Sequence, residues 1–160
     1  MTRLDALLQR AAGYTVEVPC SDAKSTSDTV EGEGPLDARI VVLGESLGQD
    51  ELRLRRPFVG KSGQKLRNHM RLAGIHPEKC RIDNVYPFYP EGGSIDKLDP
   101  GVLREWQANT LERLRLCHDT AIVVCVGNVA LETCTGLRDI TRRRGSVYAW
   151  EGRKIIGMIH

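Results

Sequence analysis

Apolar residues recur along the chain in two alternating patterns. The runs at 39–44, 81–86 and 121–127 are rich in Ile and Val, which is typical of buried strands. Between them, apolar residues at helical spacing predict helices around 4–11, 66–73, 103–114 and 129–133. Two late runs, 147–150 and 153–159, flank a Glu-Gly pair, which predicts a hairpin turn.

Strands that alternate with helices favour a mainly parallel sheet with helices on both faces. Ligands of such sheets bind at the carboxyl ends of the strands. The chain of 160 residues suits one domain over 1–160. Residues 20–35 are rich in Ser, Thr, Asp, Glu and Gly, which predicts an exposed loop.

Composition narrows the class of protein. Hydrophobic residues make up 41% and charged residues 28%, an ordinary soluble balance. No window approaches the ~20 apolar residues of a membrane span, and no apolar leader opens the chain, so we expect a cytoplasmic protein with no membrane partner. Five cysteines without a CxxC pair favour reduced, buried thiols. The net charge of +2 neither requires nor excludes nucleic acid.

Four loops carry short motifs at characteristic spacing. In chain order they are Gly44-Glu45-Ser46-Leu47-Gly48, Arg56-Pro57-Phe58-Val59-Gly60-Lys61-Ser62-Gly63, Asp83-Asn84-Val85, and Arg144-Gly145 leading to Ile159-His160. Together they resemble family 4 of the uracil-DNA glycosylases, whose pattern reads G-E-A-P-G, [RK]-P-F-V-G-x-A-G, T-N-V and R-G…H-P-S. The resemblance covers about residues 17–160 and implies a three-layer αβα fold with a central, mainly parallel four-stranded sheet.

The resemblance also implies roles for the residues of these loops. A glycosylase reads a base that has left the DNA stack, with Phe58 as the aromatic support and Asn84 as the amide that pairs with the pyrimidine edge. Backbone amides of the first loop and the imidazole of His160 would stabilise the departing uracil anion. The remaining candidates are Glu45 and Glu51 for catalysis, and Gly44, Ser46 and Gly48 for base binding.

Each of these residues also has an ordinary structural interpretation. Phe58 fits a hydrophobic core, Asn84 fits a turn at a strand end, and a terminal histidine is more often exposed than catalytic. Basic residues usually form solvated surface. Their position near the predicted site nevertheless favours contact with DNA phosphates by Lys61, Arg142, Arg143 and Arg144.

The sequence departs from the family pattern at three places. Of the four cysteines that hold the family's iron–sulfur cluster, at most Cys20 remains, because Glu17, Phe88 and about Trp106 stand at the other positions; we therefore expect no cluster and no other cofactor or metal. Leu47 replaces a proline that would stiffen the first loop. The sequence ends at His160, before the family's DNA wedge and last helix, so one face of the sheet is expected to be thinly covered.

Two functions follow. The first is excision of uracil, or a related base, from DNA. The second is a non-catalytic module of the same fold that binds DNA or a protein, within a longer polypeptide or beside a replication or repair partner. A nucleotide-binding protein of unrelated chemistry has no support, since the phosphate-binding glycine motifs are missing from the sequence. A bacterial, archaeal or viral protein associated with the nucleoid fits either function.

Overall fold

A computed structural model describes residues 29–159. Its strands and helices follow one another as β1 (Ile40–Ser46), α2 (Gln49–Leu54), α3 (Lys61–Leu72), β2 (Arg81–Tyr86), α4 (Pro100–Leu116), β3 (Ile122–Val126), α5 (Asn128–Thr135), α6 (Ile140–Arg143), β4 (Val147–Trp150) and β5 (Arg153–Met158). The predicted helix at 4–11 lies outside the described residues. Every predicted strand is present, with bounds that shift by up to two residues.

The strands form one sheet in the order β2-β1-β3-β5-β4. Strands β2, β1, β3 and β5 are parallel, and β4 pairs antiparallel with β5. The prediction of four strands was therefore too low by one, because both strands of the late hairpin join the sheet. Its two-residue turn has positive φ at Glu151 (46°) and Gly152 (82°), as a tight hairpin turn requires.

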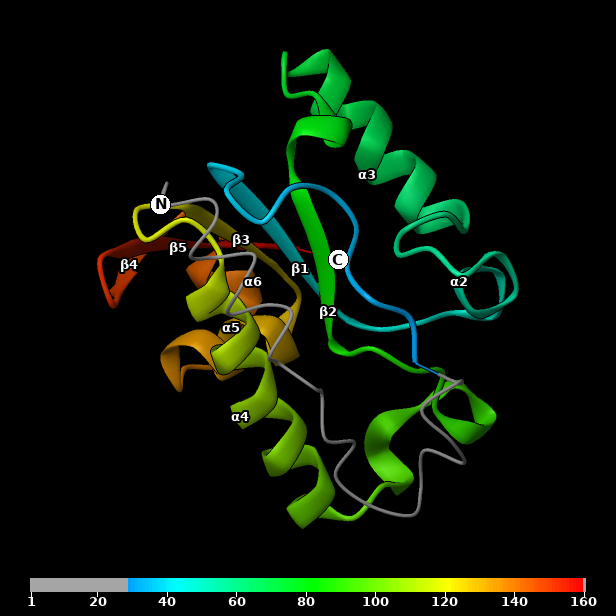
Figure 1. The fold of residues 1–160 in the computed structure, drawn as a ribbon. Coiled ribbons are helices and arrows are strands. Elements are labelled where there is room, and N and C mark those ends of the chain that lie inside the picture. Colours follow the sequence, from blue (N-terminus) through cyan, green and yellow to red (C-terminus); the bar gives the residue numbers. More distant parts are fainter. Residues whose placement is uncertain (1–28, 160) are drawn as a thin grey trace, which may run out of the picture.

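Helices cover both faces of the sheet, which confirms the three-layer αβα fold (Figure 1). The larger core cluster joins α4 and α5 to one face, with Trp106 and Leu131 fully buried against Val123. On the opposite face, Met70 of α3 packs with Val42 and neighbouring residues of the sheet in a smaller cluster.

Local sequence signals set the ends of the helices. The Asp99 carboxylate caps α4 by accepting hydrogen bonds from the backbone N–H groups of Gly101 (2.7 Å) and Val102 (3.3 Å), and Pro100 follows where no N–H is needed. Helix α5 ends at Gly136, whose φ of 71° lies in the region that favours glycine.

The described part of the predicted 20–35 loop is not a free loop. Val30 is only 4% exposed, and its N–H donates to the carbonyl of Pro87. Glu33 exchanges two backbone hydrogen bonds of 2.9 Å with Ile82. Exposure was the wrong expectation for Val30 and Glu33, because their backbone docks along β2 and Pro87, whereas Glu31, Gly34 and Pro35 are exposed.

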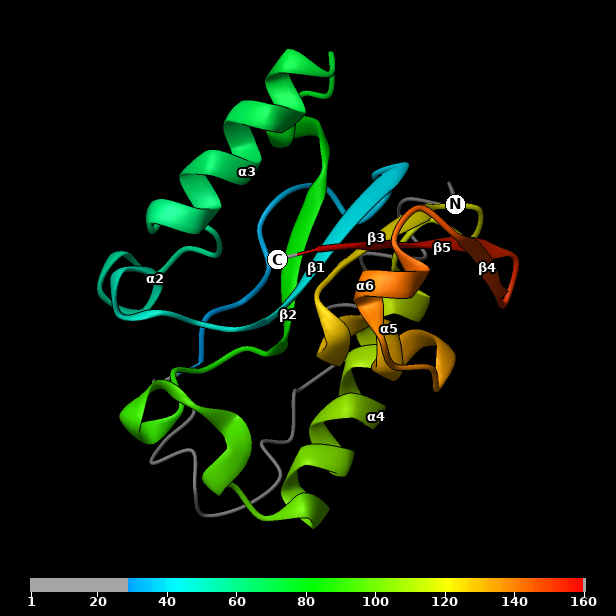
Figure 2. The same ribbon diagram turned by 180° about the vertical axis from the view of Figure 1, so that it is seen from behind.

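Among residues 29–159, the sheet face that α3 packs on carries a smaller core cluster than the face of α4 and α5. Within residues 29–159, α3 is the long helix on that face, and it lies beside β1 and β2 (Figure 2). On the same face, Val124 and Ile156 are half-buried, and Val147 of β4 is 59% exposed. The helices in this part of the chain are each too short or too polar to cross a lipid bilayer.

An aromatic stack joins the segment after β2 to α4. The ring of Phe88 lies 5.4 Å from that of Trp106 and 6.1 Å from that of Tyr86, measured between centroids. Trp106 has no exposed surface. These rings fix the backbone that leaves β2 against α4.

Replacing Trp106 with alanine should lower the free energy of unfolding by about 3–5 kcal/mol, because it empties a large volume of packed core. Denaturant unfolding followed by circular dichroism measures this change. Leu72→Ala is the matched control: Leu72 is 85% exposed, so its loss should cost less than about 0.5 kcal/mol. A Trp106→Ala cost as small as that of the control would contradict the packing described here.

Candidate functional site

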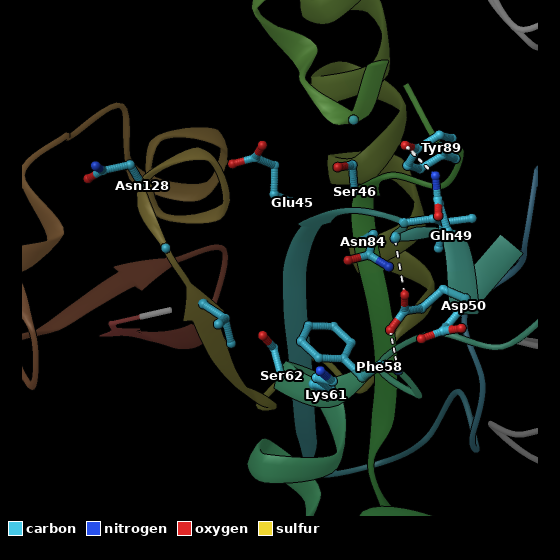
Figure 3. Close-up of a pocket in the computed structure, with 18 of the residues that line it drawn as sticks. Glu45, Ser46, Gln49, Asp50, Phe58, Lys61, Ser62, Asn84, Tyr89 and Asn128 are labelled. Atoms are coloured by element: carbon cyan, nitrogen blue, oxygen red, sulfur yellow. Dashed lines mark hydrogen bonds between the residues drawn. The ribbon is translucent and has the colours of Figure 1, made fainter. Parts of the chain in front are cut away.

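A pocket of about 820 Å³ opens at the carboxyl ends of β1, β2 and β3. It is lined by Glu45, Ser46, Leu47, Gly48, Gln49, Asp50, Glu51, Phe58, Gly60, Lys61, Ser62, Gly63, Asn84, Tyr89, Gly93, Val126, Gly127, Asn128, Ile140 and Ile159. Three of the four predicted loops thus meet at the carboxyl ends of the strands, and the fourth contributes Ile159. Figure 3 shows Phe58 and Asn84 side by side, with Lys61 and Ser62 near the ring and Glu45 further along the pocket.

Gly44 lies directly between the two predicted base-reading side chains. A Cβ atom on Gly44 would lie 2.5 Å from Oδ1 of Asn84 and 2.5 Å from Cζ of Phe58, closer than any real carbon contact. Both side chains therefore pack against the bare backbone at the end of β1. Gly44, which was predicted to bind the base, therefore has a steric role: without a Cβ atom there, the ring of Phe58 and the amide of Asn84 can lie close together.

The carboxamide of Asn84 is available to a ligand. The residue is 3% exposed and lines the pocket. Its backbone N–H donates to Oδ1 of Asp83 and its carbonyl accepts from Arg113, but among residues 29–159 its side chain makes no hydrogen bond. A buried amide without partners costs free energy unless water or a ligand satisfies it.

Phe58 has a strained backbone that two charged side chains hold. Its φ of 54° is uncommon for a bulky residue and costs about 1–3 kcal/mol. The Arg67 guanidinium donates to the carbonyl oxygens of Pro57 (2.8 Å) and Phe58 (2.9 Å). Glu51 binds the next two backbone N–H groups. These contacts orient the ring, so Phe58 is both 9% exposed and part of the pocket wall.

Arg67 is itself held by Glu33. The two form an ion pair of 2.5 Å, and Arg56 pairs with the same carboxylate at 2.9 Å. Burial alone would raise the pKa of Glu33, but the hydrogen bonds from Arg56 and Arg67 hold that pKa below its ordinary value. The carboxylate therefore stays charged near neutral pH and keeps Arg67 in place.

Glu51 lines the pocket, but its carboxylate also accepts three backbone hydrogen bonds. Its carboxylate accepts from the N–H groups of Gly48 (3.1 Å), Val59 (3.0 Å) and Gly60 (2.7 Å). It thus ties the first loop to the Phe58 loop. Because its oxygens are engaged in this clamp, the geometry fits a positioning residue better than the predicted catalytic carboxylate.

The first loop departs from the expected arrangement of free amides. Strand β1 runs on to Ser46, the N–H of Leu47 donates to the carbonyl of Phe88 (3.0 Å), and that of Gly48 donates to Glu51. The amides of Leu47 and Gly48 are therefore engaged within the protein. Leu47 is 3% exposed, so burial and a hydrogen bond that proline cannot make restrain the loop in place of the family's proline.

Two more of the predicted residues belong to the pocket wall. Glu45 is exposed and Ser46 half-buried, and both line the pocket. Burial, together with the charge of Glu45, raises the pKa of the neighbouring Tyr86 to about 12, so that phenol stays protonated. His160 lies outside the described residues, and its role stays a prediction.

Lys61 is the one of the four predicted phosphate-binding residues that lines the pocket. Lys61 lines the pocket at the first residue of α3 and is exposed. The arginine run begins two residues after Ile140, which is buried in the pocket wall. Arg142 pairs with Asp139 and Arg143 donates to the carbonyl of Arg138, while Arg144 is exposed.

Several residues of the site carry no signal in the sequence. Gln49 and Tyr89 form one wall, joined by a hydrogen bond of 3.4 Å. The side chain of Asn128 accepts from the N–H of Ile140 (2.8 Å) and links α5 to α6. Asn128 is the exception to this lack of signal, because Gly127-Asn128-x-Ala130 resembles the G-x-x-A helix start of family 4.

The family's iron–sulfur cluster does not fit the described residues. At two of the four expected ligand positions, Phe88 and Trp106 bring aromatic rings that cannot bind iron, and they pack against each other. The other two positions, Glu17 and Cys20, lie outside the described residues. Across residues 29–159, no three His, Cys, Asp or Glu side chains gather as a metal site.

Comparison with known proteins places this geometry in a family. The model of the uracil DNA glycosylase superfamily matches residues 31–160. The type-4 uracil-DNA glycosylase of Thermotoga maritima is 31% identical over 137 residues, which cover 84% of this chain and 70% of the relative. That of Archaeoglobus fulgidus is 30% identical over 149 residues, 85% of this chain and 70% of the relative. The chain therefore belongs to the uracil-DNA glycosylase superfamily.

Its likeness within the superfamily is to family 4, which confirms the resemblance drawn from the loops and makes this a uracil-DNA glycosylase-like protein of DNA repair. A DNA polymerase of Bacillus phage SP01 is also similar, with 29% identity over 132 residues that cover 82% of this chain but only 14% of the polymerase.

Replacing Glu51 with alanine should lower the free energy of unfolding by about 2 kcal/mol or more, because three backbone donors lose a charged acceptor. Thermal or denaturant unfolding measures the loss. Asp50→Ala is the control: it lies on the same helix and lines the same pocket, but its pair with Arg53 is exposed and should contribute less than about 0.5 kcal/mol. Wild-type stability in Glu51→Ala would contradict the clamp.

Proposed function

We propose that this protein excises uracil from DNA by hydrolysing the N-glycosidic bond of a flipped deoxyuridine. The observation that carries the proposal is the convergence on Gly44 of the Phe58 ring and the Asn84 amide, which no side chain or backbone group of residues 29–159 binds. An aromatic face and one free amide are what a pocket needs to stack a pyrimidine and pair with its edge.

The amide suits uracil better than cytosine. Uracil presents a carbonyl acceptor at O4 beside an N3–H donor, and a carboxamide offers one donor group and one acceptor to match. Cytosine presents the reverse pattern at the same two positions. A held amide would therefore leave cytosine with two mismatched polar contacts in a buried site, which is a strong basis for discrimination.

Bond cleavage transfers the electron pair of the C1′–N1 bond to the base, leaving a uracil anion and an oxocarbenium-like sugar. Water then adds to C1′ and loses a proton. We assign Glu45 to stabilising the sugar cation or orienting the water. Donors at Ser46 and His160 would stabilise the anion. Lys61 and the arginines at 142–144 would hold the phosphates.

A second candidate is a non-catalytic module that binds DNA or a protein partner. The engaged amides of Leu47 and Gly48 favour it, because they remove two donors from the expected anion site. The polymerase relative supports a role beside replication or repair machinery, in a longer polypeptide or as a separate partner. Either function suits a protein that works near DNA, in the cytoplasm or nucleoid.

The test is release of free uracil from an oligonucleotide with one deoxyuridine, by wild-type protein and Asn84→Ala. We expect release by wild-type and a loss of at least about 100-fold in the variant, because the base edge loses its partner. Gln64→Ala serves as the control, since Gln64 is exposed on α3 and its side chain donates to the carbonyl of Val59 rather than to a residue that reads the base. Salt-dependent DNA binding by wild-type without uracil release would reject excision and support the second candidate.

Arg144→Ala should weaken DNA binding about equally for all sequences and reduce the slope of log K against log salt by about one. Fluorescence anisotropy at several salt concentrations measures this slope. Arg71→Ala at the far end of α3 removes the same charge away from the pocket and should leave the slope unchanged. Equal effects of the two variants would argue against a DNA contact by the arginine run.

A further inference from the structure

Strand β2, which carries Asn84, is the outermost strand on one side of the sheet. In the described part of the chain only β1 pairs with it as a neighbouring strand, so its outer edge would leave backbone donors and acceptors exposed. At Ile82 the docked segment at Glu33 fills this edge with two hydrogen bonds. One step along the same edge, at Asn84, two side chains replace a neighbouring strand.

These side chains are Asp83 and Arg113. The N–H of Asn84 donates to Oδ1 of Asp83 at 2.8 Å, and its carbonyl accepts from Nη2 of Arg113 at 2.9 Å. Asp83 and Arg113 also form an ion pair with each other. Both backbone polar groups of the base-reading residue are therefore held by one charged pair.

Arg113 is fixed along its whole guanidinium. Its side chain is 13% exposed, and that of Asp83 is 8% exposed. Besides the carbonyl of Asn84, the Arg113 guanidinium donates to the carbonyl of Val85 (3.2 Å), to Oγ1 of Thr110 (2.8 Å) and to Oδ1 of Asn109 (3.0 Å). A planar fork with this many partners allows little rotation.

We propose that Asp83 and Arg113 are positioning residues that preorganise Asn84 for base recognition; the proposal rests on the function proposed above. Because the Asn84 carboxamide has no hydrogen-bond partner in the described chain, only its backbone and its packing against Gly44 fix its direction. Loosening the backbone would let the amide turn, and a recognition group displaced by about 1 Å loses much of its effect.

Burial of an arginine does not by itself indicate such a role. Arg153 is 4% exposed, and its guanidinium donates to the carbonyls of Arg115, Cys117 and Glu151. None of these residues lines the pocket. Arg113 differs because two of its contacts, Asn84 and Asp83, are the reading residue itself and the side chain that binds its N–H.

The experiment compares the kcat of uracil release by wild-type, Arg113→Met and Asp83→Asn. We expect kcat to fall about 10- to 100-fold in both variants, with a smaller preference for uracil over cytosine. Arg115→Met is the matched control, since Arg115 lies on the same helix and pairs with Glu112 and Glu151, away from β2. It should stay within about twofold of wild-type. A control-sized effect in both variants overturns the proposal.

A double-mutant cycle separates positioning from general stability. Once Asn84→Ala has removed the amide, adding Arg113→Met should cause no further loss of kcat at a temperature where both proteins are folded. If the two losses add, Arg113 acts independently of Asn84 and the proposal is rejected. Asp83→Asn, which keeps the size of the side chain, gives the same cycle if Arg113→Met does not fold.

A third measurement does not depend on activity. Hydrogen exchange at the backbone N–H of Asn84, followed by NMR, should be faster in Asp83→Asn and Arg113→Met and unchanged in Arg115→Met. Unchanged exchange in the first two variants contradicts the proposal even if wild-type releases no uracil. Absence of release with faster exchange would reject excision alone and leave the positioning pair in place.

Discussion

The site depends on the missing side chain of residue 44. Strand β1 ends beside β2, and the Phe58 loop folds over the same point. A single methyl group on Gly44 would overlap both the ring of Phe58 and the amide of Asn84. Because that position is bare, an apolar face and a polar edge from different segments meet within one pocket. The backbone at Gly44 therefore determines where the side chains of Phe58 and Asn84 can lie in the pocket wall.

Charged residues that pack behind or beside the pocket hold both of these groups. Glu33 holds Arg67, which binds the strained backbone at Phe58 together with Glu51. On the other side, Asp83 and Arg113 bind the backbone of Asn84. Each network satisfies buried polar groups that no strand or helix reaches. Polar networks of this kind cost free energy when only partly formed, which ties stability to the shape of the site.

Much of the fold could be predicted from the sequence. The β-branched runs and the helices around 66–73, 103–114 and 129–133 lie where local patterns placed them, because these signals act over a few residues. The hairpin turn was also correct, but the count of strands was not, since a pattern shows an arm and not its neighbours. The docking of Val30 and Glu33 on β2 was missed for the same reason: polar, glycine-rich residues carry no mark of the edge they cover.

The sequence pointed to the residues that meet in the pocket but not to the charged residues that hold them. Phe58, Asn84 and Gly44 were found through the order and spacing of the loops, whereas Arg67 and Arg113 lie on helices as ordinary charged residues. Glu51 was identified as important, but its geometry fits a clamp. Two members of the expected amide group, at Leu47 and Gly48, are engaged within the protein, because a hydrogen bond between distant segments cannot be read from a motif.

A crystal structure with DNA that carries 2′-fluoro-deoxyuridine tests the central claim most directly, since the fluorine disfavours the sugar cation and leaves the bond intact. The account predicts an extruded uracil stacked on Phe58, with its O4 and N3–H bonded to the carboxamide of Asn84. A base that stays in the duplex, or one bound elsewhere on the protein while this pocket remains without it, would contradict the account.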